Sequence, residues 1–254
     1  FQRTIRYHSP QRVLEDIGTC IRNNIRNFFF CDPNFTFDKK RTMEIMDGII
    51  KKRWEINIWC ETRVDLVDID MLAKMAKGGV KWIAYGLESA DKKVLKAINK
   101  KIDLEQFRKI VKMTQDLGIE AEVFTIYGLP KQTYGSACQT LEFIKDLKVK
   151  MRGNSQGQQL SLYFGTDIYD NPEKFGIHII NKQRPLFLSP AATFETEYMN
   201  RQDISGIRRR CELESFLDTV EADKVNLNEL ENYVMTCYSI DYFYPQPNLL
   251  KIVF

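Results

Sequence analysis

The feature that most constrains this chain is a regular alternation of short apolar runs with longer amphipathic stretches. The apolar runs have the length and composition of β-strands, and each interval between them is long enough for a crossover helix. Such alternation is typical of a parallel sheet or barrel with helices on its outside, connected by right-handed crossovers. The predicted strands cover residues 25–32, 55–61, 82–88, 120–128 and 159–164.

Start and stop signals support helices in the intervals. Ser9-Pro10 is a typical helix start, Asp103 is a candidate N-cap, and Gly78-Gly79 and Gly118 are typical stops. After residue 165 the alternation ends. The predicted helices cover the stretch after Pro10 and residues 38–53, 68–77, 103–117, 133–147, 209–220 and 228–238.

Composition excludes several functional classes. The chain has 254 residues, 44% of them hydrophobic, which suffices for one large domain with an appendage or for two small ones. A net charge of +3 does not call for nucleic acid or an acidic membrane, and no apolar run reaches membrane-spanning length. The six cysteines include no Cys-x-x-Cys pair, so we expect a reducing, cytoplasmic compartment. With only two histidines, histidine-based acid–base chemistry is disfavoured.

Polar side chains stand where the predicted strands end, and three of them are carboxylates. Asp32, Glu61 and Glu88 close the first three strands. The chemistry of parallel barrels lies at these strand ends. By strand parity Asp32 shares a face with Phe28 and Phe30, and Glu61 and Glu88 share the inward faces of their own strands. If all three faces line a barrel, the carboxylates converge. The alternative is that they are turn residues or N-caps, Glu88 for the helix that starts near Lys92.

The motifs, taken in order, resemble the radical S-adenosylmethionine superfamily, most closely its branch with an upstream cobalamin-binding domain. The stretches that carry the resemblance are "FFFCDPNFTFDKKR", "INIWCETRVD", "GGVKWIAYGLESADKKVLKAINK", "IYGLPKQT" and "YFGTDIYDNPEKFG". The resemblance implies a partial (β/α) barrel of six units over residues 1–176. It also implies a mostly helical extension over residues 177–254 that covers the barrel opening.

Two departures from the family pattern stand out. The Cys-x-x-x-Cys-x-x-Cys loop of the family is absent, and with it the first barrel strand; we expect both to lie upstream of Phe1. "LPKQT" carries Lys131-Gln132 where relatives commonly show Gly-Glu, which weakens any expectation of a carboxylate role at that position.

The resemblance implies S-adenosylmethionine and a [4Fe–4S] cluster as cofactors, with cobalamin in the full-length protein. One electron passed from the cluster to the sulfonium would yield a 5′-deoxyadenosyl radical. Carboxylates would accept from the ammonium and ribose hydroxyls, Arg63 would hold the methionine carboxylate, and backbone groups over 126–129 would hold the adenine. Ala84 and Gly86 would be small because the ligand passes over them. The expected cofactor-binding residues are Asp32, Asn34, Glu61, Arg63, Glu88, Ser89, Ile126, Gly128, Leu129 and Phe164.

The leading hypothesis is therefore a radical enzyme that performs methyl transfer or an oxidative rearrangement on a small-molecule substrate. A flavodoxin or ferredoxin would be its reducing partner. One alternative is a cluster-free barrel that binds S-adenosylmethionine or another nucleotide without radical chemistry. A further alternative is a barrel that uses Asp32, Glu61 and Glu88 with Mg²⁺ or Mn²⁺ for hydrolysis.

Overall fold

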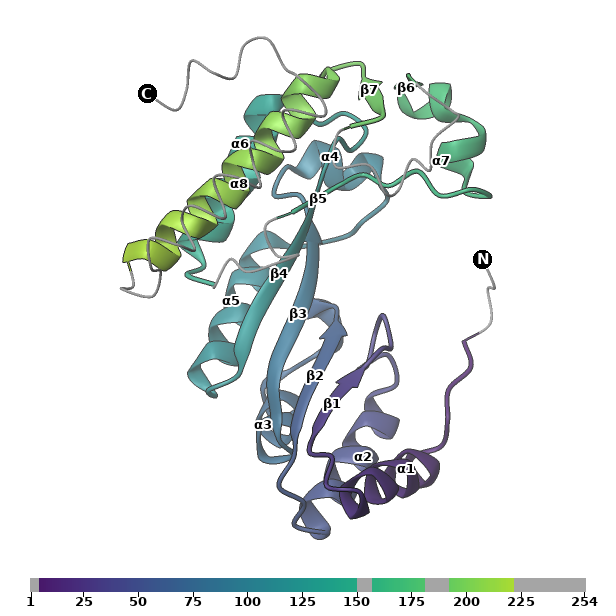
Figure 1. Ribbon diagram of the computed structural model, residues 1–254, viewed down its shortest axis with the longest axis vertical. Coiled ribbons are helices and arrows are strands. Elements are labelled where there is room, and N and C mark those ends of the chain that lie inside the picture. The colour runs from purple at the N-terminus through teal and green to yellow at the C-terminus, as the bar shows by residue number, and fades with distance from the viewer. Residues whose placement is uncertain (1–4, 150–156, 181–191, 222–254) are drawn as a thin grey trace. The chain divides into compact units, whose positions relative to one another are not determined.

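The computed structural model describes residues 5–149, 157–180 and 192–221. Five parallel strands form a half-barrel in the order β1-β2-β3-β4-β5 (Figure 1). The fold class expected from the alternation and the resemblance is confirmed. The strands are β1 (Asn27–Phe30), β2 (Asn57–Thr62), β3 (Val80–Glu88), β4 (Glu120–Tyr127) and β5 (Gln158–Gln159).

The described residues belong to two compact units, which strands β3 and β4 both enter. Unit 1 holds residues 1–87, 102–124 and 144–150, and unit 2 holds the remainder. The boundary at residue 176 that the resemblance implies stays a prediction. No helix in the described ranges is both long and apolar enough to cross a bilayer.

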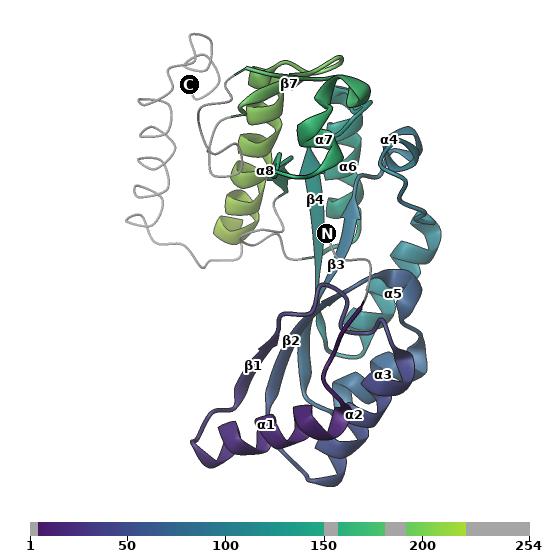
Figure 2. The same ribbon diagram turned by 90° about the vertical axis from the view of Figure 1, so that its right-hand side faces the viewer.

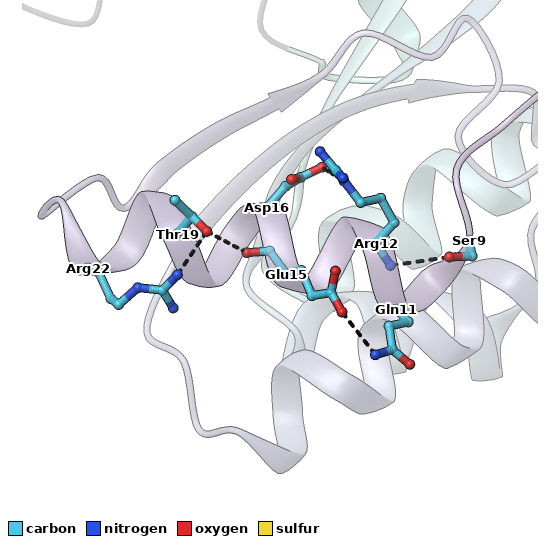
Figure 3. Close-up of polar contacts among 7 residues, drawn as sticks. All are labelled: Ser9, Gln11, Arg12, Glu15, Asp16, Thr19 and Arg22. Atoms are coloured by element: carbon cyan, nitrogen blue, oxygen red, sulfur yellow. Dashed lines mark hydrogen bonds and ion pairs between the residues drawn. The ribbon is translucent and has the colours of Figure 1, made fainter.

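Unit 1 contains the first helices, each started by a side-chain cap. In α1 (Pro10–Arg22) the Ser9 hydroxyl accepts from the Arg12 backbone N–H at 3.2 Å. Figure 3 shows this cap and the i,i+4 pairs on the exposed face of the helix, among them Arg12–Asp16 at 3.0 Å. Asp caps start α2 (Lys39–Lys51), α3 (Ile69–Lys77) and α5 (Leu104–Asp116), as their sequences indicate.

One face of the unit 1 strands packs against helices and the other remains partly accessible. Figure 2 shows α2, α3 and α5 on one side of these strands. In β2, Ile58 and Cys60 are fully buried while Trp59 and Glu61 are not, and after its first two residues β3 shows the same alternation except at Ala84, which is buried. The parity expected for Glu61 and Glu88 is confirmed, since both stand on the half-buried faces of their strands. The core on the helical side includes Ile45, Met46, Met71, Leu72, Ile83, Tyr85, Phe107 and Val111.

Unit 2 holds the ends of β3 and β4 and everything after residue 151. It contains α4 (Lys92–Ala97), α6 (Tyr134–Asp146), α7 (Asp167–Asp170), a 3-10 turn η3 (Pro172–Phe175) and α8 (Arg201–Glu221). An antiparallel pair, β6 (Ile177–Ile179) and β7 (Phe194–Thr196), was not expected from the sequence. Helix α8 begins eight residues before the predicted 209. The helix predicted over 228–238 lies outside the described residues.

The fifth predicted strand, 159–164, is shorter than expected. Only Gln158 and Gln159 pair with β4, opposite Ile126 and Tyr127, and the Leu160 N–H then donates to the Tyr127 carbonyl at 2.8 Å. Because β4 ends at Tyr127, the next residues have no strand to pair with. Phe164 consequently lies in a turn with 62% of its surface exposed.

Candidate functional site

The loop after β1 lies against the end of β2 and positions three of the predicted residues. The Phe35 N–H donates to the Glu61 carbonyl at 2.9 Å, and the Phe35 side chain is fully buried. Next to it the buried hydroxyls of Thr36 and Thr62 hydrogen-bond to each other. These contacts place Asn34 and the neighbouring Asp32 beside the end of β2.

Asn34 carries an unsatisfied acceptor in this loop. Its Oδ1 atom is buried and has no hydrogen-bond partner among the described residues. Native proteins pair the large majority of their buried polar atoms, so an orphaned one needs an explanation, such as a bound ligand. A ligand with hydroxyl or ammonium donors would satisfy it.

Glu61 is a second acceptor without a partner. Its carboxylate makes no hydrogen bond or ion pair within the described part of the chain, and burial raises the pKa of this carboxyl. The adjacent Cys60 faces the helices. Burial raises the pKa of its thiol to about 12, and the charges of Glu61 and Asp32 add to the effect. The loop that holds Asp32 and Asn34 is bonded to the backbone of Glu61, and we call these three residues the acceptor cluster.

The parity argument for Asp32 is wrong, although Asp32 does lie near Glu61. Phe28 and Phe30 pair with Ile58 and Cys60, which face the helices and not the accessible face. Strand β1 ends at Phe30, so the position of Asp32 is set by the loop rather than by the pleat. Sequence pattern alone could not show where the strand stops.

Arg63 already has a partner that sequence reasoning missed. Its guanidinium donates to both carboxylate oxygens of Asp65, from Nε at 2.9 Å and from Nη2 at 2.7 Å. This two-pronged contact, on exposed side chains, is the one expected with a ligand carboxylate. A ligand carboxylate that made the same contact with Nε and Nη2 would have to displace Asp65.

In unit 2, Glu88 stands at the end of β3 in a left-handed backbone conformation, with φ of 65°. Its carboxylate forms an ion pair with Lys100, which follows α4. Glu88 does not cap α4, because Asp91 does so by accepting from the Lys93 N–H at 2.6 Å. The capping alternative for Glu88 is therefore wrong.

Ser89 is buried and holds the turn that follows β3. Its hydroxyl accepts from the Asp91 N–H at 3.1 Å and lies 3.3 Å from the Thr140 hydroxyl of α6. Thr140 also accepts from the Ala90 N–H at 3.0 Å. In this structure Ser89 fixes the backbone that presents Glu88.

Gln132 occupies the backbone groups that were expected to hold an adenine. Its buried Oε1 accepts from the N–H of Gly128 at 2.7 Å and of Leu129 at 3.3 Å, while its Nε2 donates to the Ile126 carbonyl at 3.3 Å. An adenine bound there would compete with Gln132. The Gln in "LPKQT" thus has a structural task, which its sequence position alone did not indicate.

The other predicted residues of unit 2 differ in accessibility. Gly128 has φ of 84°, and a Cβ placed on it would lie 2.8 Å from the Phe194 ring. Leu129 is 3% exposed, whereas Ile126 is half-buried. Phe164 packs edge-on against Tyr169, with ring centroids 4.7 Å apart. In unit 1, Ala84 is only 1% exposed, so protein atoms already cover one of the two small residues expected under a ligand.

The described residues do not fit an iron–sulfur cluster. None of the described cysteines, Cys20, Cys31, Cys60, Cys138 and Cys211, is in a disulfide, and each stands in a different segment. In the part of the chain that the structure describes, no group of three or more His, Cys, Asp or Glu side chains is placed to hold a metal ion. The acceptor cluster does fit the donor groups of S-adenosylmethionine, which are an ammonium and two ribose hydroxyls.

Comparison with known proteins identifies the family of the chain. The model of the radical SAM superfamily matches residues 1–144. An uncharacterised methyltransferase of Pyrococcus horikoshii is 29% identical over 150 residues, which are 59% of this chain and 33% of the relative. The anaerobic magnesium-protoporphyrin IX monomethyl ester cyclase of Rubrivivax gelatinosus is 27% identical over 149 residues, 58% of this chain and 27% of the cyclase. The chain thus spans about a third or less of these relatives.

Among solved structures, similarity extends to the radical S-adenosylmethionine methyltransferase TsrM from Kitasatospora setae, with cobalamin and a [4Fe-4S] cluster bound. The TM-score is 0.62 at 14% identity, over 71% of this chain and 35% of TsrM. At this identity the likeness concerns the fold.

Proposed function

Because this chain belongs to the radical S-adenosylmethionine superfamily, we propose that it binds S-adenosylmethionine through its acceptor cluster and transfers a methyl group to a small-molecule substrate. The observation that carries the proposal is the buried Oδ1 of Asn34, in a loop that hydrogen-bonds through the Phe35 N–H to the Glu61 backbone. Neither this Oδ1 nor the Glu61 carboxylate has a partner among the described residues. Methyl transfer is favoured over other chemistry by the methyltransferase relative and by the fold shared with TsrM.

Each residue has a task that its chemistry allows. The carboxylates of Glu61 and Asp32 accept from the ammonium or ribose hydroxyls, and Asn34 Oδ1 accepts one further hydrogen bond. A hydrogen bond to a charged group is stronger than a neutral one, which favours carboxylates opposite an ammonium. Bound S-adenosylmethionine supplies an activated methyl group and, on one-electron reduction, a radical. Cluster ligands would come from outside the described residues, and cobalamin from an upstream domain, as we expect from the resemblance.

The remaining predicted residues extend the proposal. Glu88, oriented by Lys100, accepts a further ligand hydroxyl; Arg63 exchanges Asp65 for the methionine carboxylate. Ser89 acts by fixing the turn behind Glu88. The adenine lies among four predicted residues, Ile126, Gly128, Leu129 and Phe164. Gln132 competes with it for the backbone N–H and carbonyl groups of this turn. A flavodoxin or ferredoxin supplies the electron.

Binding of S-adenosylmethionine to the full-length protein, measured anaerobically by calorimetry, tests the proposal. Asn34→Ala should weaken binding about tenfold, the equivalent of one hydrogen bond to a charged or strongly polar donor. It should not lower the free energy of unfolding, because the removed oxygen has no partner among the residues that the structure describes. Glu61→Gln should weaken binding by a similar factor, and Glu55→Gln, an exposed control in the segment before β2, should not. Unchanged affinity in both site variants would refute the acceptor cluster.

Two measurements separate the alternatives. Transfer of a labelled methyl group from S-adenosylmethionine would support methyl transfer, whereas cleavage without transfer would favour the alternative of an oxidative rearrangement. Iron counting addresses the cluster-free alternative. Roughly four irons per chain in the full-length protein are expected, and binding of S-adenosylmethionine without iron would favour the non-radical barrel.

A further inference from the structure

Three large aromatic side chains stand in one line across the accessible face of unit 1. Phe29 of β1 is in register with Trp59 of β2, and Trp59 with Trp82 of β3. The rings of Phe29 and Trp82 lie with centroids 6.3 Å apart and planes at 43°. We call these three residues the aromatic row.

The aromatic row is not packed as a core. Phe29 has 52% of its surface exposed, and Trp59 and Trp82 are both half-buried. Neither indole N–H donates a hydrogen bond to any residue in the described ranges, although a buried indole usually finds a partner. Single exposed aromatics are ordinary, but three in one register line form a contiguous apolar surface of the kind that lines ligand-binding grooves.

Polar groups flank the aromatic row on both sides along the strand direction. Two residues earlier, the side-chain Nδ2 of Asn57 donates to the side-chain Oδ1 of Asn27 at 2.9 Å. Two residues later, Glu61 of the acceptor cluster is in register with Ala84. The face is therefore a strip of three rings between an amide pair and a carboxylate, and adjacent strands about 4.8 Å apart give it a width of about 10 Å.

These dimensions select the kind of occupant. A stable protein–protein interface buries about 800 Å² on each partner, which is more than three half-exposed side chains can supply. Aromatic faces instead favour offset or edge-on contact with another flat ring. Helices α2, α3 and α5 cover one face of the unit 1 strands (Figure 2), and the strip is on the other face, where its three rings keep part of their surface exposed.

We propose that the aromatic row binds the substrate, and that the substrate carries a planar conjugated ring. The ring stacks against Trp59 and Trp82, its polar substituents reach the Asn27–Asn57 amide pair, and its reacting edge points toward Glu61. This inference rests on the proposed function, because the methyl donor is placed at the acceptor cluster one layer further along the strands.

A matched pair of probes tests the ring directly. Naphthalene-2-carboxylate is flat, and decahydronaphthalene-2-carboxylate has the same carbon skeleton without the conjugation. In ¹⁵N NMR spectra of the full-length protein, the naphthalene probe should shift the indole signals of Trp59 and Trp82. The Trp54 signal is the internal control, because that ring packs against Lys52, at 5.1 Å, and against Gly18. Equal shifts from both probes, or shifts at Trp54 alone, would overturn the proposal.

Two phenylalanines of equal exposure supply the control variants. Phe29 and Phe37 are each 52% exposed, and only Phe29 belongs to the aromatic row. Phe29→Leu should weaken naphthalene-2-carboxylate binding several-fold, Trp82→Leu about tenfold, and Phe37→Leu not at all. If Phe29→Leu and Phe37→Leu behave alike, the row does not select flat rings.

Further outcomes keep this inference separate from the proposed function. Indole shifts that depend on protein concentration without any probe would assign the row to a second copy of the chain and refute a substrate role. S-adenosylmethionine affinity, measured on the same preparations, reports the acceptor cluster independently. Normal S-adenosylmethionine binding without preference for the flat probe would overturn the ring proposal alone.

Discussion

The carboxylate of Glu88 forms an ion pair with the ammonium of Lys100, twelve residues further along the chain. The pair joins the end of β3 to the segment after α4, and both side chains are largely buried. It explains how a glutamate is held at a strand end whose backbone is left-handed. Lys100 thereby becomes a positioning residue for the ligand-binding role that we propose for Glu88.

Loss of Lys100 should therefore affect both stability and binding. Lys100→Met leaves a largely buried carboxylate without its partner, which should cost about 1–3 kcal/mol of unfolding free energy. S-adenosylmethionine affinity should fall as well, because Glu88 is no longer oriented. Glu88→Gln combined with Lys100→Met should cost less than the sum of the single changes. Lys101→Met, at an exposed neighbour, is the control; additive losses would mean that the pair is not coupled.

Because Asp65 and a ligand carboxylate would both bind Arg63, substitutions at Asp65 and at Arg63 should change S-adenosylmethionine affinity in opposite directions. If Arg63 serves the methionine carboxylate, Asp65→Asn frees its guanidinium and should tighten S-adenosylmethionine binding a few-fold, whereas Arg63→Lys should weaken it. Stability should change by less than about 1 kcal/mol in both, since the pair is exposed. Calorimetric affinities that are the same for both variants and the wild type would assign Arg63 to the local turn only.

Gln132 should be one of the more sensitive positions in unit 2. Gln132→Leu removes the acceptor of two backbone N–H groups, and leaving these groups unsatisfied in a buried place should cost about 2–4 kcal/mol. At a pH low enough to keep its buried carboxyl neutral, Gln132→Glu retains an acceptor for both N–H groups and an O–H donor for Ile126, so it should cost less there. Urea unfolding of the two variants provides the comparison. A Leu variant as stable as the Glu variant would show that the Gln132 contacts add little.

Glu61 should make stability depend on pH. Because burial raises its pKa in the folded state, folded Glu61 holds its proton to higher pH than unfolded Glu61, whose pKa is about 4.3. The free-energy cost of burying the ionised carboxylate in the folded state is absent below the unfolded pKa. It grows as pH rises toward the folded pKa and is complete above it. Glu61→Gln should thus gain stability over the wild type at pH 7 but not at pH 4, as measured by urea unfolding. Glu55→Gln controls for the loss of one negative charge; equal behaviour of both variants would assign the effect to net charge.

Much of the fold could be predicted because its signals are local. Ser9, Asp38, Asp68 and Asp103 each start a helix through a bond to a backbone N–H within three residues, and such contacts are readable from sequence. Strand parity likewise placed Glu61 and Glu88 correctly. Both kinds of signal depend only on residues that are close together in the sequence.

The site was less predictable because its contacts depend on loops and on side-chain geometry. Because β1 ends at Phe30, Asp32 lies in the following loop, where strand alternation does not set its direction. Arg63 contacts Asp65, Glu88 contacts Lys100, and Gly128 contacts Gln132. These partners stand in turns or after helices, where no regular alternation in the sequence predicts which way a side chain points. The unsatisfied acceptor of Asn34 could be recognised only once the loop was folded against β2.

The packing of Phe194 on Gly128 bears on where this protein can be divided. Gly128 belongs to the stretch shared with the superfamily, residues 1–144, while Phe194 and Cys211, whose thiol donates to the Tyr127 hydroxyl at 3.1 Å, do not. A fragment that stops at residue 144 would leave the Gly128 turn uncovered and the Tyr127 hydroxyl without that donor. Recombination with relatives should accordingly exchange this turn and residues 192–211 as one piece, because each was shaped against the other.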